Sequence, residues 1–353
     1  MTTAWRKSGN AQGPRSQLVF RERVPAGYGP IGHLSLLAAR LLDLELVHPQ
    51  APANPKLSAL RRALFRAPFG ADSGVIYIAS NAHWIRTLAA QEDFYKPKRF
   101  RAIWIIDSFL TEGVPSAWMM RHFDLLIYMQ RGEADFYERL APGRTLYLPW
   151  GADVLDLGSS AAERPVDVLR VGRQPDAWDD DARSEEACEA AGLRFSGRPP
   201  YLPEDPSDPS AGHRHLSTYY ARAKFVLAHS NLAAPAPYTH PTKEYITGRW
   251  TDALAGGAVV AGVHPYGDAT AADLLWPGAT LDFDRIDLAH NIEALREAVA
   301  CWTPDQARRN HLQALGQLDW RWRLQTLAEA LDLTSPALDA ELSRLRAAME
   351  AET

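Results

Sequence analysis

The chain lacks several features that would assign it quickly to a class of protein. Only two of its 353 residues are cysteines, Cys188 and Cys301, and their spacing matches no metal or redox motif. We therefore expect a reducing, cytoplasmic environment. No apolar run reaches about 18 residues, and the first residues hold no apolar signal-peptide core, so we expect neither a membrane span nor a secretory signal.

A large excess of one charge is also missing. The formal net charge is −5, which gives no global attraction to nucleic acid or to an anionic membrane. We therefore expect no nucleic-acid partner and at most peripheral membrane contact. With 46% hydrophobic and 23% charged residues, the composition is typical of a soluble globular protein.

The first part of the chain alternates short apolar runs with helical patterns. After a polar, glycine-rich stretch at 1–16, which we interpret as a flexible arm, a domain is predicted over 17–155. Its apolar runs are typical of buried parallel strands: GVIYIAS (74–80), RAIWIID (101–107) and DLLIYM (124–129). Helical patterns lie at 33–45 (HLSLLAARLLDLE) and 57–67 (LSALRRALFRA). This rhythm predicts a doubly wound parallel sheet.

A second series of the same kind follows a linker-like hinge at 151–163. It predicts a second α/β domain over 165–333, with strands at VDVLRVGR, KFVLAHS and AVVAGV. The Pro- and Asp-rich stretch at 199–215 predicts a loop, and GRWTDALAGG predicts a helix ended by glycines. We expect two Rossmann-like domains facing a cleft, with ligand beyond the carboxyl ends of the strands. The amphipathic tail at 334–353 predicts a helix, and the last helices are expected to pack back on the first domain.

The most informative stretch runs from His240 to Gly262. Lys243, Glu244, Arg249 and Asp252 lie just before a buried strand, where unpaired charge is costly. If one helix carries both acids, they lie two turns apart on one side; if the helix starts near Thr247, Glu244 precedes it and Asp252 falls in its second turn.

In either case, a helix N-terminus offers free N–H groups to a phosphate. Arg249 adds a cationic fork suited to diphosphate oxygens, and the carboxylate of Asp252 suits a ribose diol. The segment thus predicts a binding site for a nucleoside diphosphate. The alternative is a set of surface salt bridges on a capping helix.

The same segment resembles the C-terminal domain of GT-B glycosyltransferases, especially family 4 (group 1) and its spore-maturation-like relatives. Their signature is Ser-x-x-Glu, seven residues, then Glu-Ala-hydrophobic-Ala-x-Gly and a strand. Here Ser230 follows the strand KFVLAHS, Glu244 and Asp252 take the acidic positions, and Gly257 takes the glycine. VLRVGR resembles that domain's first strand and places Arg173 in the diphosphate-contacting position. The likeness covers most of 17–333 and is only architectural in the first half.

The resemblance implies a glycosyltransferase that moves a sugar from a nucleoside diphosphate sugar, with retention of configuration, to a glycan, a lipid-linked sugar or a small molecule. It implies that Glu244 holds the donor sugar and Asp252 the ribose. Arg249, Arg173 and the amides of a Gly29–Gly32 loop would stabilise the departing diphosphate. We expect no cofactor and no metal, because no Asp-x-Asp pair stands at a strand end.

The sequence also departs from the family pattern. The second acid is Asp rather than Glu, and acids replace the lysine usually found after the Gly-Arg pair. An insertion, NLAAPAPYTHPTK, separates Ser230 from Glu244, and Lys243 or Arg249 would replace the missing lysine. Two other classes therefore stay open: a sugar-nucleotide epimerase on the same fold, and a catalytically silent binding or scaffold protein.

Further candidate site residues allow both a functional and a structural interpretation. Asp107 ends a predicted strand, where it would meet an acceptor or cap a helix. His33 follows the glycines and would touch sugar or phosphate, or belong to a helix's first turn. His229, beside Ser230, suits a donor pocket. The pair at His213 and His215 is half a metal motif without a second half.

Overall fold

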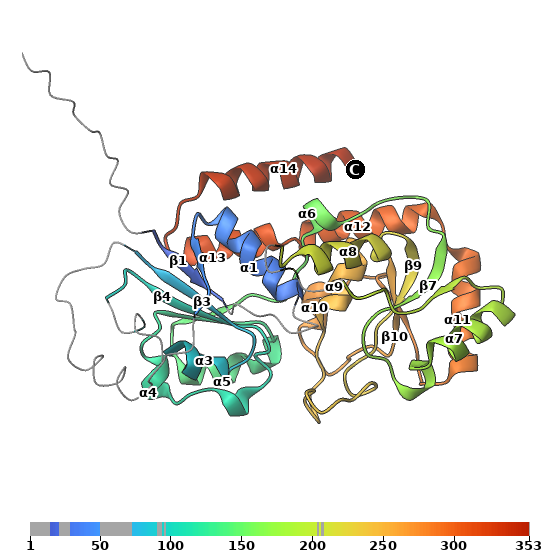
Figure 1. Ribbon diagram of the computed structural model, residues 1–353, viewed down its shortest axis with the longest axis horizontal. Helices are drawn as coiled ribbons and strands as arrows, with labels where there is room; N and C mark the ends of the chain where they lie inside the picture. Colours follow the sequence, from blue (N-terminus) through green and yellow to red (C-terminus); the bar gives the residue numbers. More distant parts are fainter. Residues whose placement is uncertain are drawn as a thin grey trace, which may run out of the picture.

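The computed structural model describes residues 15–20, 29–49, 73–89, 94, 97–202, 205 and 208–352. The predicted helix at 57–67 and residues 1–14 of the predicted arm lie outside the described residues. Two α/β bodies lie side by side, and a long C-terminal helix passes over both (Figure 1).

The first body contains a parallel sheet in the strand order β2-β1-β3-β4-β5-β6. Its strands are β1 (Gln17–Val19), β2 (Glu45–Val47), β3 (Val75–Ala79), β4 (Arg101–Ile105), β5 (Leu125–Tyr128) and β6 (Thr145–Tyr147). Its helices are α1 (Gly29–Leu41), α3 (Trp84–Ala89), α4 (Ala117–Met120) and α5 (Ala134–Leu140), with short 3-10 turns η2 (Thr111–Gly113) and η3 (Arg131–Glu133). β3 is buried throughout, and β4 and β5 are buried after their first residue, which confirms the interpretation of the apolar runs as interior parallel strands.

The second body contains a separate parallel sheet in the order β11-β10-β9-β7-β8. Its strands are β7 (Val166–Arg170), β8 (Phe195–Ser196), β9 (Ala223–Leu227), β10 (Val259–Gly262) and β11 (Thr280–Asp282). The helices are α6 (Val154–Leu157), α7 (Asp181–Ala190), α8 (Ala211–Tyr220), α9 (Gly248–Ala255), α10 (Ala271–Leu274), α11 (Leu288–Cys301) and α12 (Pro304–Gln317), with the turn η4 (Asp176–Trp178). Helices α8, α9 and α12 contribute to the core on one face, and α7 and α11 to that on the other. Two sheets of Rossmann-like type are therefore present, as the sequence predicts.

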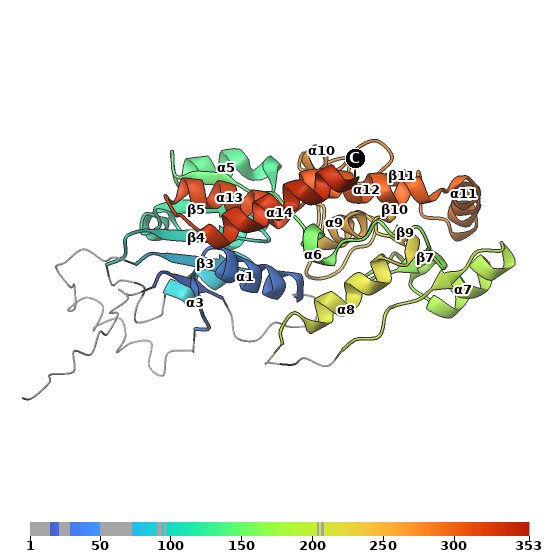
Figure 2. The same ribbon diagram turned by 90° about the horizontal axis from the view of Figure 1, so that it is seen from above.

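The last two helices return to the first body. In α13 (Trp320–Ala330), Trp320 and Leu324 belong to the apolar core that contains Trp104, and the Trp104 and Trp320 ring centroids are 6.0 Å apart. Helix α14 (Pro336–Glu352) packs on α1, α12 and α13, and so lies over both bodies (Figure 2). Helix α13 falls within the range 165–333, but its apolar face fills the first core.

A buried charge cluster holds these helices to the hinge. Arg321 is fully buried and bonds Asp153 (2.8 Å), Asp156 (2.7 Å), Asp319 (3.2 Å) and Glu341 (2.7 Å). Burial alone would lower the pKa of Arg321, but the surrounding carboxylates raise it. One guanidinium thus ties the hinge residues Asp153 and Asp156 to α13 and α14.

Two helices begin earlier than the sequence suggests. Helix α1 starts at Gly29, so Gly29 and Gly32 lie within it and the predicted Gly29–Gly32 loop is wrong. Pro30 suits a first helical turn because its φ is fixed and its missing N–H would be unpaired there. Helix α8 starts at Ala211, so His213 and His215 are helical rather than in the predicted loop. None of the helices in the described part of the chain is long and apolar enough to cross a membrane.

Candidate functional site

The candidate site is built around the N-terminus of α9. Thr247 has extended backbone angles and precedes the first helical residue, Gly248. Glu244 therefore lies in the loop before the helix and Asp252 in the second turn, which decides between the two arrangements left open above. The Trp250 amide donates to the Thr247 carbonyl oxygen (3.0 Å), whereas the two amides before it, of Gly248 and Arg249, have no partner within the helix and are available to an anion.

Gly257 ends this helix for a structural reason. Its φ is +78°, a region that side chains rarely adopt, and an added Cβ would lie 2.5 Å from the Ser159 carbonyl oxygen. The close approach of the hinge segment therefore accounts for this glycine.

The carboxylate of Glu244 is held in a fixed orientation. It accepts hydrogen bonds from the Ser230 hydroxyl, at the end of β9, and from the Gly267 amide (2.7 Å), beyond β10. An added Cβ at Gly267 would lie 2.9 Å from this carboxylate. The strand ends thus aim Glu244, and Ser230 serves as its support.

Asp252 lies in a different setting. It is 9% exposed, and its carboxylate has no hydrogen-bond partner among the described residues. Burial, with a smaller contribution from the charge of Asp153, raises its pKa well above the ordinary value. A carboxyl in such surroundings is costly to ionise without a partner, which makes Asp252 a candidate to bond a ligand.

Other polar atoms near α9 are also unsatisfied among the described residues. They are Nε2 of His229, the Thr247 hydroxyl, the Tyr220 hydroxyl and Nε of Arg173. Burial, and then the charge of Arg249, lowers the pKa of His229 to about 3, so its imidazole is neutral. Its Nδ1 accepts the Val263 amide (3.2 Å), which leaves Nε2 as a potential donor.

Two arginines meet at the carboxyl end of β7. Arg249 donates through Nη1 to the carbonyl oxygens of Val171 (2.9 Å) and Arg173 (2.8 Å). Burial lowers the pKa of Arg249 to about 10, so it stays charged at neutral pH. Arg173 lies 5.4 Å from the ring centroid of the exposed Tyr238. The pair gives this edge of the sheet positive charge.

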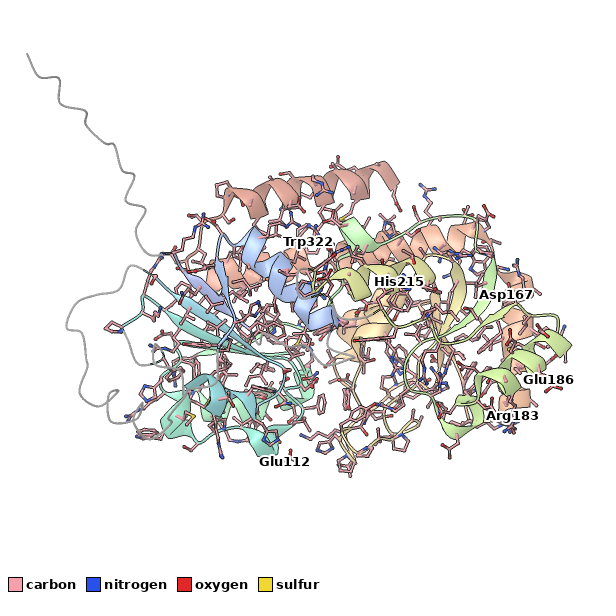
Figure 3. The ribbon with its side chains drawn as sticks, in the orientation of Figure 1. Glu112, Asp167, Arg183, Glu186, His215 and Trp322 are labelled. Atoms are coloured by element: carbon pink, nitrogen blue, oxygen red, sulfur yellow. The ribbon has the colours of Figure 1, made fainter. Side chains whose placement is uncertain are left out.

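Lys243 points away from the other charged residues of its segment. Its Nζ lies 2.7 Å from Oε1 of Glu133, on the first body, and donates to the Phe109 carbonyl oxygen (3.3 Å). Nearby, His240 lies 3.7 Å from Glu112, which stands at the edge of the first body (Figure 3). The four charged side chains of the segment therefore do not form one cluster. Lys243 contacts the first body, whereas Glu244, Arg249 and Asp252 lie in the second.

On the first body, Asp107 follows β4 and faces the second body. Burial raises the pKa of its carboxyl to about 7. Burial, and then the charge of Asp107, raises the pKa of Tyr245 to about 12, which places the two groups near one another. Asp107 therefore approaches the loop that carries Glu244.

His33 occupies the junction between the bodies rather than an open position. Its Nε2 lies 2.8 Å from Asp153, its Nδ1 lies 3.0 Å from the Ser210 hydroxyl, and its ring centroid is 5.0 Å from that of His213. Burial would raise the pKa of Asp153, but His33 and Arg321 outweigh it and lower the pKa to about 2. Both ring nitrogens of His33 are thus engaged.

The sequence missed several residues that shape this region. Asp268 accepts the Ile246 amide (2.8 Å) and the Thr270 amide (2.9 Å), and so fixes the backbone before α9. Tyr220 contributes its buried hydroxyl from α8. Single acids and tyrosines far from the motif carry no pattern that would have singled them out.

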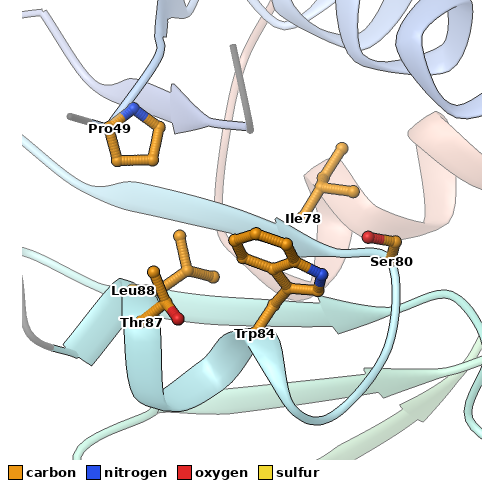
Figure 4. A pocket seen from close by; sticks show the side chains of 6 residues that line it. All are labelled: Pro49, Ile78, Ser80, Trp84, Thr87 and Leu88. Atoms are coloured by element: carbon orange, nitrogen blue, oxygen red, sulfur yellow. The ribbon is translucent and has the colours of Figure 1, made fainter. Parts of the chain in front are cut away.

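A small hollow lies on the first body at the carboxyl end of β3. Figure 4 shows its lining, which comes from Pro49, β3 and α3 and includes the Trp84 ring beside Ser80. Its lining is mainly apolar, and all of it comes from the first body.

Comparisons with known proteins agree with the fold. No family model matches the chain, and no curated protein matches it in sequence. Among solved structures, it is similar to sucrose-phosphate synthase from Thermosynechococcus elongatus (TM-score 0.54, 12% identity, covering 90% of this chain and 98% of that one). It is also similar to Anabaena HepE in complex with UDP and glucose (TM-score 0.55, 10%, 90% and 99%) and to AviGT4, a glycosyltransferase of avilamycin A biosynthesis (0.50, 16%, 95% and 98%). The chain therefore has the two-domain fold of GT-B glycosyltransferases.

Proposed function

We propose that this protein is a glycosyltransferase whose second domain binds a nucleoside diphosphate sugar and whose first domain presents the acceptor. The observation that carries the proposal is Asp252, a buried carboxyl without a described partner, close behind a helix N-terminus flanked by two arginines. A diphosphate, a ribose and a sugar would supply the groups that these residues lack. HepE, which shares the fold, has been solved with UDP-glucose, and this supports the same class of donor.

Each part of the donor is assigned to particular residues of the second domain. The free amides at the start of α9, with Arg249 and Arg173, take the diphosphate and stabilise it as it departs. Asp252 takes the ribose diol. Glu244, already aimed by Ser230 and Gly267, takes the hydroxyls of the donor sugar. His229 and Thr247 have polar atoms without described partners that suit the phosphate oxygens.

The acceptor side is assigned to the first domain. Asp107 lies across from the Glu244 loop and can accept a hydrogen bond from an acceptor hydroxyl. We propose transfer with retention of configuration, without a metal, at the level of a hexosyltransferase. The acceptor class is a glycan, a lipid-linked sugar or a small molecule, in a cytoplasmic setting.

The test separates nucleotide binding from transfer. Asp252→Ala should weaken binding of bare UDP by roughly ten- to a hundredfold, because two hydrogen bonds to the ribose diol are lost. Glu244→Ala should leave UDP affinity nearly unchanged and lower turnover of UDP-sugars by roughly a hundredfold, because the sugar is misplaced. Calorimetry and a donor-hydrolysis assay across nucleotide sugars measure both.

Two control variants test whether the effects of Asp252→Ala and Glu244→Ala are specific to the site. Glu186→Ala removes an exposed carboxylate on α7, far from the site (Figure 3), and should change neither quantity. Glu244→Gln keeps one acceptor oxygen for Ser230 and should fold like the parent. If both alanine variants bind and turn over like the parent, the charged segment is a set of structural contacts and the proposal fails.

A second candidate is a binding protein without transferase activity. It is favoured by the departure at Asp252 and by the acids that replace the family's usual lysine after Arg173. Such a protein would be stabilised on heating by UDP, GDP or dTDP, yet would hydrolyse no nucleotide sugar in the same screen.

A further inference from the structure

Neighbouring residues of one loop face in opposite directions across the interface between the domains. Lys243 reaches the first domain, where its Nζ lies 2.7 Å from Glu133. Glu244, the next residue, turns back to Ser230 and Gly267 in the second domain. A contact made by Lys243 therefore acts on the backbone that also carries Glu244.

That backbone is stiffened by the inserted segment. Asn231 donates from Nδ2 to the carbonyl oxygens of Lys243 (2.7 Å) and His240 (3.2 Å), and its Oδ1 accepts the Tyr245 amide (3.1 Å). Nδ1 of His240 accepts the Lys243 amide (3.0 Å). These bonds bracket Glu244 and link the backbone from His240 to Tyr245, so the positions of Lys243 and Glu244 are coupled.

The ion pair lies in partly desolvated surroundings. The side chains of Glu133 and Lys243 are 13% and 34% exposed, and Lys243 also donates to the Phe109 carbonyl oxygen. Such a pair is stronger than one at an open surface, because water screens it less. Glu133 itself ends η3, directly after β5, so it is anchored to the first sheet.

We propose that Glu133 and Lys243 are a positioning pair that aligns the donor-sugar carboxylate of Glu244 with the first domain. In this proposal Lys243 does not take the place of the family's phosphate-binding lysine. Its contact with Glu133 fixes where the donor-sugar site lies relative to the first domain. The inference rests on the proposed function, since it assigns a purpose to the position of Glu244. It makes the insertion between Ser230 and Glu244 the element that couples the two domains.

The central variant is Glu133→Gln, which keeps the shape and removes the charge. We expect the turnover number for transfer to fall by roughly three- to thirtyfold, as for loss of a partly buried ion pair. The affinity for UDP should change by less than about twofold, because Glu133 touches no donor group. Asp135→Asn is the matched control: it removes a neighbouring exposed charge with no described partner and should be silent.

The charge-reversed pair tests the mechanism directly. Glu133→Lys alone places two cations face to face and should lower turnover further than Glu133→Gln, whereas Glu133→Lys with Lys243→Glu should recover much of it. Lys243→Arg, which can still pair with Glu133, should resemble the parent. If the double reversal stays as inactive as the single one, or if Lys243→Met weakens UDP binding tenfold or more, Lys243 serves the donor phosphates and the inference fails.

A measurement without catalysis separates this inference from the proposed function. Distances between spin labels placed on the two domains, measured by electron paramagnetic resonance, report the separation of the domains whether or not UDP binds. Small-angle scattering reports the overall dimensions of the same variants. We expect Glu133→Gln to widen the distribution of interdomain distances while Asp135→Asn leaves it unchanged. A parent that binds no UDP but shows this shift would refute the proposed function alone, and an unchanged distribution in Glu133→Gln would overturn the positioning pair.

Discussion

The rings of Phe109 and Tyr245 stack across the interface between the two domains, with centroids 3.8 Å apart and planes inclined by 10°. Phe109 follows the strand end that carries Asp107, and Tyr245 follows Glu244 in the sequence. Both rings are almost fully buried. The stack therefore joins the candidate acceptor side to the candidate donor side.

Phe109→Leu should loosen this contact without touching the nucleotide. An aromatic pair contributes about 0.5–1.5 kcal/mol beyond its buried area, so transfer should fall by roughly two- to tenfold. UDP affinity measured by calorimetry should stay within about twofold. Phe136→Leu, on α5 within the first domain, is the control, and an equal loss of transfer in both variants would contradict the interdomain role.

Asp107 predicts a particular pH dependence. Because burial raises its pKa to about 7, its carboxylate form becomes dominant only above that pH. If the carboxylate accepts the acceptor's proton, kcat/KM should rise between about pH 6 and 8, and Asp107→Asn should lower the rate and remove that rise. The stability linked to the neutral carboxyl is complete below the unfolded pKa and is lost as pH rises through 7. A pH–rate profile that Asp107→Asn leaves unchanged would exclude this role.

Asp252 predicts opposite effects on stability and on binding. Its raised pKa means that the charged form is disfavoured in the folded protein, so the folded state loses stability as pH rises through that pKa. Asp252→Asn should therefore raise the melting temperature of the ligand-free protein at pH 8 while weakening UDP binding. Thermal denaturation at pH 5 and pH 8, with and without UDP, measures both effects. A lower melting temperature at pH 8 would show that the carboxylate is already compensated.

Transfer should not require a divalent metal. The proposed site stabilises the departing diphosphate with Arg249, Arg173 and the amides of α9, so cations are already supplied by the chain. Activity should survive EDTA without loss. Complete loss on chelation, reversed by manganese, would show that the phosphate site needs a metal.

Arg321 predicts a large effect on stability at a distance from the site. Arg321→Met would leave four nearby carboxylates without their shared cation, and breaking a buried ion pair costs about 3–5 kcal/mol. The melting temperature should therefore fall sharply. Arg346→Met, on the exposed side of α14, should change it little. Equal effects in both variants would mean that the cluster contributes no net stabilisation.

Local pattern determined the architecture of this protein. The runs at 74–80, 101–107 and 124–129 are apolar throughout, and only a strand covered on both faces buries such a run, so parallel sheets followed from the sequence. The end of α9 followed from the glycines at 256 and 257, whereas its start at Gly248 was left open by the sequence and was decided by the structure. The sequence did not predict that α1 begins at Gly29 or that α8 begins at Ala211, because glycine, proline and serine are common both in loops and in first helical turns.

The arrangement of the site was decided by tertiary structure alone. In the sequence, Lys243 and Glu244 are neighbours, and nothing local separates a residue that meets Glu133 from one that meets Ser230. Asp252 differs from any helical acid only because α9 packs against the hinge segment and leaves its carboxyl buried. His33 and Asp153 are 120 positions apart and bond only because the domains meet. Periodicity is set by neighbours along the chain, whereas burial and charge pairing depend on which distant segments come together.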